Sequence, residues 1–507
     1  MSSLNDLTNY DQPLNPNSID IRTEYLEPIS SSTLKYTFRL DQTGYLDTNS
    51  MLVFKLKSVG ADQNLKCRVN QWNGALGGIK RVIFQIGDNI INDIQDVYKY
   101  STLKNMNMGS NMRNNFLGHY LGNSMWLDGQ KSLGDKPEKF GSNNAYTINT
   151  YAEEYLTTTG SVVVDHAKSG IDFGKFADGQ NAQINSHAIG NDTAVNTQYG
   201  IPLGMLIPAL KNQKIPLFLF DKQRILLTFE FNTADVYCNN IKASKIDYNT
   251  TLTSNAQADR GDVVPAEVRM VIDYIVMPTD VQNELVEQTR KEGGYKLEFY
   301  DVVNVEKNIG QGTNNQTQEV EHRIGQNNRE VHSIIMWKEM NIISMNDGTN
   351  TKGACLMGAQ KCQGFSREEY NCNIDGRDEF DHSVFHPVSQ YNEVSEVLGK
   401  DLQVARAMYC CDENTQASNL SPLSTGLLGT MKPLALSLRN GNSGIVGGGR
   451  QVGNYPIVWK WRRDCHDNRI NSNPQDDFPV KCNYFVELSR VANVLDTGKG
   501  TSVVVSY

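Results

Sequence analysis

The chain has 507 residues, a formal net charge of −9 and a hydrophobic fraction of 39%. This length predicts roughly two to four domains and is ample for burying large cores. The acidic balance argues against a protein whose main surface grips nucleic acid, because such surfaces are usually basic. The sequence has no apolar run of about 18 residues. Its polar N-terminus lacks the apolar segment of a signal peptide, so we expect neither a transmembrane helix nor secretion.

The cysteines favour reduced, packed thiols over a disulfide framework. The chain contains nine, which is an odd number. An odd count without a signal peptide is typical of thiols that stay reduced. Seven of them follow Gly353 at irregular spacing: Cys355, Cys362, Cys372, Cys410, Cys411, Cys465 and Cys482.

The first part of the chain predicts an arm and then a series of strands. Residues 1–30 are polar and contain three prolines, which indicates an arm that becomes ordered only against a neighbour. Apolar and polar residues alternate in 34–40, 52–57 and 79–86, and turn signals separate these runs, so we predict strands. Residues 90–108 suggest a short helix after the last turn.

Residues 119–200 are rich in Gly, Asn, Ser and Thr. A structureless loop of that length is improbable inside a compact domain, so we predict strands separated by long loops. Such loops lie on the surface, where exposed function would be found.

The stretch from Ile201 to Phe231 has the clearest sheet signature. Two Ile-Pro-Leu triplets begin at Ile201 and Ile215. Proline lacks the donor that a central strand needs, so we place both triplets at strand ends and corners. In the run that follows, alternate residues share one face of a predicted strand: Ile225, Leu227, Phe229 and Phe231.

A strand over 267–277 precedes the best helix prediction, Thr279 to Gly294. Thr279 is expected to cap this helix, Gln282 completes a capping-box pattern, and Gly293-Gly294 ends it. The helix separates two series of strands, which indicates a connector between domains. The second series covers 295–305, 330–340, a loop-rich insertion at 345–430, and then 433–438, 456–461, 484–488 and 502–505. The two halves repeat this order of strands and insertion with little residue identity, which predicts two all-β domains of the jelly-roll or a similar sandwich type.

Three blocks resemble a known family. Ile79 to Ile91, Ile215 to Phe231, and Val271 to Asp280 with its helix are similar to blocks of double jelly-roll major capsid proteins. Residues 329–340 fall where an early strand of the second roll belongs. In length and acidic composition the chain resembles most the virophage branch, small double-stranded DNA viruses that parasitise giant viruses.

The resemblance implies an all-β fold of two consecutive eight-stranded jelly rolls joined by a short helical linker, with long inserted loops. It divides the chain into an N-terminal arm (1–30), a first roll (31–278), a helical linker (279–294) and a second roll (295–507). It also implies a homotrimer, a pseudo-hexagonal capsomer that tiles an icosahedral shell around double-stranded DNA. The long loops would lie at the top of the capsomer and the arm on its inner side.

The same resemblance implies neighbouring capsomers, penton proteins and minor capsid proteins as partners. It implies a location in the virion shell after synthesis in the host cytoplasm. We expect no sequence-specific nucleic-acid recognition, no stable membrane insertion, no catalytic residues, no cofactor and no metal. The alternative is a glycan-binding or carbohydrate-active β-sandwich protein, which would need paired carboxylates in a cleft or an aromatic platform.

One segment follows the calcium-loop pattern in part. Oxygen-bearing side chains occupy its first, third and fifth positions (Asn371, Asn373 and Asp375), and Gly376 comes sixth. The twelfth position holds His382 where the pattern requires a bidentate Glu, and no flanking helix pair is evident. We therefore favour a solvated acidic loop. Acid–base chemistry is the other candidate here, from His382 and His386 with three carboxylates nearby, Asp378, Glu379 and Asp381.

The tryptophans near the C-terminus could form a nucleic-acid platform. Trp459 and Trp461 flank Lys460, and Arg462-Arg463 come next. Basic and aromatic residues together bind single strands by stacking. Two Trp on one face of a strand are equally typical of a core, and acidic residues follow at once, so we favour the core.

The remaining motifs favour ordinary structural roles. Asp464-Cys465-His466-Asp467 lacks the regularly spaced partners of a metal site, and the adjacent Cys410 and Cys411 would point to opposite faces of a strand. The Gly-rich run Gly444 to Gly449 opens no helix and lacks the Lys of a phosphate loop. Arg260-Gly261-Asp262 is ordinary turn chemistry. Four glycosylation sequons lie in polar loops and would matter only on a secretory route, at Asn191, Asn249, Asn315 and Asn419.

Overall fold

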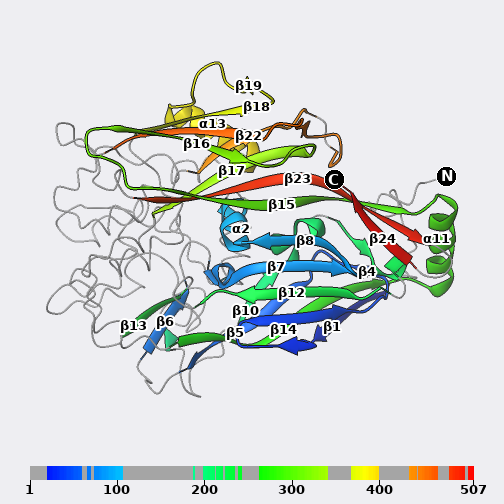
Figure 1. Cartoon of the computed structure of the whole chain (residues 1–507). Coiled ribbons are helices and arrows are strands. Elements are labelled where there is room, and N and C mark those ends of the chain that lie inside the picture. The colour runs from blue at the N-terminus through cyan, green and yellow to red at the C-terminus, as the bar shows by residue number, and fades with distance from the viewer. Residues whose placement is uncertain are drawn as a thin grey trace, which may run out of the picture.

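The computed structural model describes residues 20–59, 65–69, 74–106, 121, 187–188, 198–211, 213–220, 223–233, 238–242, 262–340, 367–398, 433–441, 444–465, 479–496 and 501–506. All statements about structure concern these residues. The sheets are antiparallel throughout, and four of the five lie one above another (Figure 1). Within the described ranges, no helix has the length and apolar character needed to cross a membrane.

The first half of the chain forms two facing sheets and a small third one. The outermost sheet has the order β10-β5-β14-β4-β11, and β1 pairs with the other edge of β14. The sheet facing it has the order β2-β3-β12-β7-β8, and the small sheet has the order β13-β6-β9. The strands are β1 (Asp20–Leu26), β2 (Ser30–Ser31), β3 (Lys35–Leu40), β4 (Tyr45–Leu46), β5 (Met51–Val59), β6 (Leu65–Val69), β7 (Ile79–Ile86), β8 (Asn89–Gln95), β9 (His187–Ala188), β10 (Gln198–Pro202), β11 (Ile215–Pro216), β12 (Ile225–Phe231), β13 (Cys238–Lys242) and β14 (Asp262–Val276).

The second half forms two further sheets. One has the order β15-β23-β17-β20, with β21 beside β17 and β24 beside β23, and the other has the order β16-β22-β18-β19. The strands are β15 (Tyr295–Ile309), β16 (Thr317–Ile324), β17 (Glu330–Met340), β18 (Glu368–Ile374), β19 (Arg377–Asp378), β20 (Leu434–Ser437), β21 (Arg450–Gln451), β22 (Ile457–Asp464), β23 (Val480–Asp496) and β24 (Thr501–Ser506). The helical elements are η2 (Gly74–Gly78), α2 (Val97–Met106), α8 (Leu203–Leu206), η6 (Pro208–Leu210), η7 (Leu217–Phe220), α11 (Thr279–Lys291) and α13 (Pro387–Leu398).

Strand β12 confirms the alternation predicted from the sequence. Ile225, Leu227 and Phe229 are fully buried, while Thr228 on the other face bonds across to Thr37 at 3.1 Å. The strand lies between β3 and β7, so its backbone is paired on both edges. The prolines lie at strand ends, as predicted. Pro202 is the last residue of β10 before α8, and Pro216 is the last residue of β11 before η7.

The N-terminal region differs from the prediction of an arm with little structure. Residues 20–26 form β1, which pairs with β14 from Asp20 opposite Val276 to Leu26 opposite Met270. Residues 30–31 form β2. The polar composition hid these strands, because β1 is held by backbone pairing at a sheet edge rather than by a buried apolar face.

Helix α11 confirms the predicted helix but not its predicted cap. The N-cap is Pro278, with no side-chain cap, and the Gln282 Nε2 donates to the Met277 carbonyl at 2.9 Å. A capping box needs an N–H on the N-cap residue, which proline lacks. The predicted glycine end is confirmed. The Gly294 N–H donates a hydrogen bond to the Thr289 carbonyl, and the Gly293 N–H donates one to the Arg290 carbonyl. These two bonds form the Schellman motif.

The second half has its own core between its two sheets. Trp459 and Tyr370 stack there with ring centroids 5.0 Å apart, and both side chains are buried. Three cysteines among the described residues are buried and form no disulfide: Cys372, Cys465 and Cys482. A separate and larger core begins between the sheets of the first half and continues into the second half.

The two glycines that end α11 should differ in their tolerance of alanine. Gly293 has a φ of +84° and open space where a Cβ would lie, so Gly293→Ala should lower the free energy of unfolding by about 1 kcal/mol. Gly294 has a φ of +123°, and a Cβ there would lie 2.6 Å from the Val494 carbonyl oxygen. Gly294→Ala should therefore cost about 2 to 3 kcal/mol, measured by urea unfolding. Equal losses for the two variants would contradict this account.

Candidate functional site: the junction of the two halves

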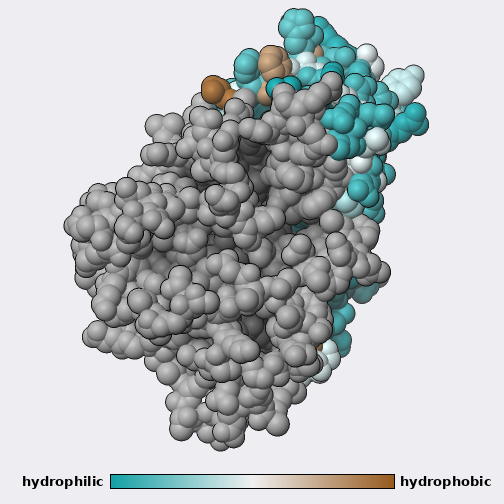
Figure 2. Space-filling view, turned by 90° about the vertical axis from the view of Figure 1, so that its left-hand side faces the viewer, coloured by the Kyte–Doolittle hydropathy of each residue, from teal (hydrophilic) through white to brown (hydrophobic). Residues whose placement is uncertain are grey.

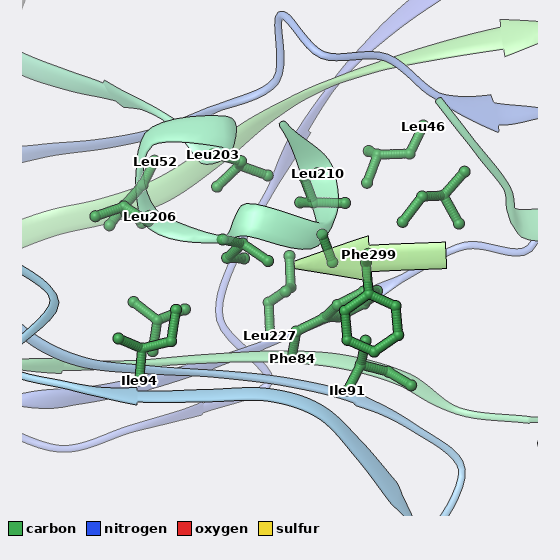
Figure 3. Packing of buried hydrophobic residues seen from close by; sticks show 14 of the residues in the cluster. Leu46, Leu52, Phe84, Ile91, Ile94, Leu203, Leu206, Leu210, Leu227 and Phe299 are labelled. Atoms are coloured by element: carbon green, nitrogen blue, oxygen red, sulfur yellow. The ribbon is translucent and has the colours of Figure 1, made fainter. Parts of the chain in front are cut away.

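The sheet of β15, β23 and β17 joins the two halves, because both of its faces are buried. Ile334 and Met336 point into the core of the second half. Their neighbours Ile335 and Trp337 belong to the larger core that includes the first half. From β15, Phe299 lies among first-half residues that include Ile91 and Leu210 (Figure 3). The two halves therefore share one continuous hydrophobic core.

Helix α2 lies between the two halves, next to β8 and β15 (Figure 1), and buries the charged side chain of Lys99. Lys99 is 2% exposed, and its Nζ lies 3.1 Å from Glu339 on β17 and 3.5 Å from Asp96. Burial disfavours the charged ammonium, but the two carboxylates outweigh it and raise the pKa of Lys99. Glu339 also accepts a hydrogen bond from Trp337 Nε1 at 2.8 Å. This ion pair joins the first half to the second.

Glu487 on β23 is the centre of a second buried polar group. Its carboxylate accepts hydrogen bonds from the Tyr100 and Ser333 hydroxyls, and its Oε1 lies 2.6 Å from Lys104 Nζ. Arg439 Nη2 is 3.8 Å from the other oxygen. Burial opposes ionisation here, but Lys104 and the two hydroxyl donors outweigh it and lower the pKa of Glu487 to about 2. Tyr100 and Lys104 belong to α2, so this carboxylate also ties the halves together.

A third polar group closes the junction beside β8. Asn92 Nδ2 donates to Asp301 Oδ1 at 2.9 Å and to the Tyr300 carbonyl at 3.3 Å. Arg490 Nη1 lies 2.8 Å from Asp301 Oδ2 and is also buried. Asn92 Oδ1 accepts from the Ala209 N–H at 3.2 Å. Buried polar groups are costly unless paired, so these contacts select one relative position of the two halves.

Comparisons with known proteins identify this arrangement. No family model matches the chain, and no curated protein matches its sequence. Among solved structures it is similar to VP54 of PBCV-1, fitted into a cryo-EM reconstruction of the virophage Sputnik, with a TM-score of 0.54 at 10% identity over 98% of this chain and 100% of that chain. It is also similar to the PBCV-1 virus capsid structure, with a TM-score of 0.52 at 10% identity over 98% of this chain and 100% of that chain. The Sputnik virophage structure has a TM-score of 0.51 at 9% identity, over 100% of this chain and 92% of that chain.

The chain has the double jelly-roll fold of viral capsid proteins. The fold class predicted from the sequence, two jelly rolls, is thereby confirmed. The sheets of β1 to β14 are the first jelly roll, and those of β15 to β24 are the second. The junction described above is the contact between the two rolls.

The structure places the partial calcium loop on a β-hairpin of the second roll. Asn373 lies on β18, and Asp375 and Gly376 form the turn to β19 with φ values of 53° and 81°. Two of the three candidate ligands already use their oxygens: Asp375 accepts from the Gly453 N–H at 2.9 Å, and Asn371 Oδ1 accepts from the Cys372 N–H at 2.7 Å. Asn373 donates its side-chain N–H to Asp378 at 2.8 Å. Among the described residues, no group of three potential metal ligands exists.

The candidate acid–base residues are dispersed into ion pairs. Asp378 lies 3.0 Å from Lys460 Nζ, and Glu379 lies 2.5 Å from Arg450 Nη1. The remaining members of this group are exposed on the loop that precedes α13: Asp381, His382 and His386. This arrangement holds the hairpin against β22 and β21 and offers no convergent pair for proton transfer.

The tryptophans of β22 confirm the favoured core interpretation. Trp459 and Trp461 are buried, and Trp461 Nε1 donates to Glu368 at 3.0 Å. The basic residues between and beside them have carboxylate or amide partners. Lys460 pairs with Asp378, Arg462 lies 3.1 Å from Glu369 and 3.6 Å from Glu319, and Arg463 is buried with Gln318 as its acceptor. No aromatic platform for bases is exposed on this strand.

The Gly-rich run holds a carboxylate of the chain itself. Gly449 N–H donates to Glu330 Oε1 at 2.7 Å. Burial opposes ionisation of Glu330, but the N–H groups of Gly447 and Gly449 outweigh it and lower its pKa. Asp464 lies at the end of β22, bonded to Thr317, and Cys465 beside it is buried. The sequon residue Asn315 is exposed in a turn. The other predicted residues lie outside the described ranges: Asn191, Asn249, Arg260, Gly261, Cys410, Cys411, Asn419, His466 and Asp467.

The outer face of the second roll carries paired charges: Arg462 lies between Glu319 of β16 and Glu369 of β18, and Lys460 pairs with Asp378 of β19. The described atoms visible in Figure 2 are mostly hydrophilic, with a few hydrophobic residues at the upper end. The exposed apolar side chains of this roll include Phe385 and Val388 at the start of α13. Sequence reasoning missed the junction charges, because Lys99, Glu339 and Glu487 lie far apart in the chain and share no motif.

Removing the Glu487 charge should destabilise the protein. Glu487→Gln leaves Lys104 without its buried counter-charge, so we expect a loss of about 3 kcal/mol in the free energy of unfolding, measured by urea unfolding at pH 7. Glu319→Gln on the outer face of the second roll is the matched control. Its carboxylate is 72% exposed, so the control should change stability by less than about 0.5 kcal/mol. Equal effects of the two variants would show that the junction charge is dispensable.

The same pair of proteins predicts a pH dependence. The folded-state pKa of Glu487 is about 2, below the value of about 4.3 for an unfolded chain. Its contribution is therefore fully present above the unfolded pKa and is lost as pH falls through the folded pKa. The stability difference between wild type and Glu487→Gln should shrink as the pH falls from about 4.3 to about 2. A difference that stays constant over this window would contradict the assignment.

Proposed function

We propose that this chain is a major capsid protein that assembles into trimeric, pseudo-hexagonal capsomers, which tile an icosahedral shell around double-stranded DNA. The observation that supports this most directly is the likeness of the whole chain to VP54, over 98% of this chain and 100% of that one. Both jelly rolls take part in that likeness, so it is not the resemblance of one common sandwich. The three structures compared above come from the PBCV-1 capsid and the Sputnik virophage.

The junction supports this proposal on physical grounds. A capsid subunit must keep one shape while it contacts its neighbours. Two domains without a large shared interface would move relative to each other by default. Here a continuous core and three buried polar groups hold the rolls as one block. Three such blocks, each with two rolls, make the six-sided outline of a capsomer. The protein then acts by shape and contact, without catalysis or a cofactor.

The proposal keeps the division of the chain inferred from the sequence (an arm over 1–30, a first roll over 31–278, a helical linker over 279–294 and a second roll over 295–507), except that β1 and β2 assign residues 20–30 to the first roll and leave 1–19 as the arm. The arm lies on the inner side of the shell and the long insertions on the outer side. Neighbouring capsomers, penton proteins and minor capsid proteins are the partners. The protein is made in the host cytoplasm and resides in the virion shell.

The purified chain should form a trimer. Light scattering coupled to gel filtration should give three times the 56.7 kDa mass of one chain, with no dissociation on dilution to the micromolar range, because trimer contacts within a capsomer are obligate and large. Electron microscopy of the same sample should show pseudo-hexagonal particles. A stable monomer at micromolar concentration would contradict the proposal.

The alternative function, glycan binding or carbohydrate hydrolysis, predicts a different result. A glycan array probed with the labelled protein should show no specific binding if the chain is a shell tile. In the described residues the large aromatic side chains of β22 point inward, so they provide no sugar platform. Strong binding to one glycan class by a chain that does not assemble would favour the alternative.

A further inference from the structure

Strand β1 is an edge strand. One edge of β1 pairs with β14, from Asp20 opposite Val276 to Leu26 opposite Met270. No strand among the described residues pairs with its other edge. The outer edge therefore presents a row of backbone N–H and C=O groups, which is a template for pairing with another chain.

The outward face of β1 carries large apolar side chains. Residues directly opposite each other in a sheet share a face, so Ile21 lies beside Ile275 and Tyr25 beside Val271. This face is opposite the one that carries the fully buried Ile272 and Tyr274 of β14. Ile275 of β14 is itself buried in the larger core, so the exposed apolar side chains of this face are those of β1. Ile21 is 65% exposed and Tyr25 is 72% exposed. Between them, Thr23 bonds Asp273 at 2.6 Å. Exposed apolar side chains on an open sheet edge mark an interaction surface.

The sequence of β1 is complementary to itself. It reads Asp-Ile-Arg-Thr-Glu-Tyr-Leu, with Thr23 at its centre. If two copies lie antiparallel with Thr23 opposite Thr23, then Ile21 faces Tyr25 and Arg22 faces Glu24, each pair twice. Arg22 Nη2 already lies 2.5 Å from Glu24 Oε1 within one chain, so the four charges of the pair alternate in sign. Pairs of an aromatic with a β-branched residue, and of opposite charges, stabilise antiparallel strands.

The backbone allows the same register. A two-fold axis at Thr23 pairs residue 21 with 25 and residue 22 with 24, so odd positions meet odd and even meet even. Outward N–H groups on one copy then meet outward C=O groups on the other, as an antiparallel ladder requires. The axis is normal to the sheet, so apolar side chains of both copies lie on one face and charged side chains on the other.

We infer that β1 joins two copies of this chain by antiparallel pairing across a two-fold axis, which makes one continuous sheet from two first rolls. Self-complementarity of charge and shape is what an isologous contact requires and what a different partner would not require. The inference rests on the proposed function in one respect. A two-fold contact cannot relate the chains of a three-fold capsomer, so it joins neighbouring capsomers.

Charge reversal tests this pairing. Arg22→Glu puts two glutamates opposite two glutamates in the pair, and Glu24→Arg does the same with arginines. Sedimentation velocity at rising protein concentration should show wild-type capsomers associating in pairs, and each single variant associating at least about tenfold more weakly. An equal mixture of the two variants restores opposite charges at both positions, so its association should return to the wild-type level. The double variant Arg22→Glu/Glu24→Arg should also associate like wild type.

Controls separate this contact from misfolding and from the proposed function. Arg462→Glu, on the outer face of the second roll, should leave pairing unchanged, and all variants should keep the capsomer mass of wild type and unfold in one cooperative transition. Hydrogen exchange of residues 20–26 should become slower on association.

Lack of association by wild type, undiminished association of both single variants, or a mixture that stays dissociated would each overturn the inference. Amides of β1 already protected in isolated capsomers would show that another segment of the chain covers this edge, with the same consequence. Failure to form a trimer would refute the proposed function alone. The pairing of β1 would remain testable, because sedimentation velocity of the charge-reversal variants and their mixture can also be measured on monomeric chains.

Discussion

The structure depends on one sheet that is buried on both of its faces. Strands β15, β23 and β17 supply apolar side chains to the core of the second roll and, from alternate positions, to the core shared with the first roll. A sheet in that position cannot slip by one residue, because a slip would exchange its two faces. The alternation of side chains between the two faces of this sheet thus fixes how the two rolls pack together. Two sandwiches with separate cores would instead be linked only through α11.

The polar groups of the junction add specificity to this hydrophobic contact. Apolar surfaces can slide over one another with little change in free energy, whereas a buried ion pair is favourable only at a defined geometry. Lys99 with Glu339, and Lys104 with Glu487, join residues of α2 to residues of the second roll. Helix α2 therefore positions one roll on the other. This gives a physical reason for burying charged residues at a cost in desolvation.

The two outer faces of the stacked sheets differ in whether their charged and apolar groups are already paired within the chain. On the second roll, cross-strand carboxylates satisfy Arg462 and Lys460, which leaves a polar surface compatible with solvent. On the first roll, β1 has an edge that no described strand pairs, with Ile21 and Tyr25 exposed. The proposed role in a shell needs both kinds of surface, because contacts must form at some faces and be avoided at others. Weak contacts between the proposed capsomers would be sufficient, since each capsomer would make many of them.

The sequence by itself determined the elements whose signal is local: the alternation in β12, the proline corners at Pro202 and Pro216, the glycine end of α11, and through three blocks the double jelly roll itself. It misjudged β1, whose stability comes from backbone pairing with β14, and the cap of α11, where Pro278 lacks the required N–H. The junction was decided only in three dimensions. Lys99 pairs with Glu339 and Lys104 with Glu487 across long stretches of chain, so both pairs depend on which strand faces lie together in the folded protein. Local patterns encode periodicity and turns, whereas contacts between distant charges follow from packing.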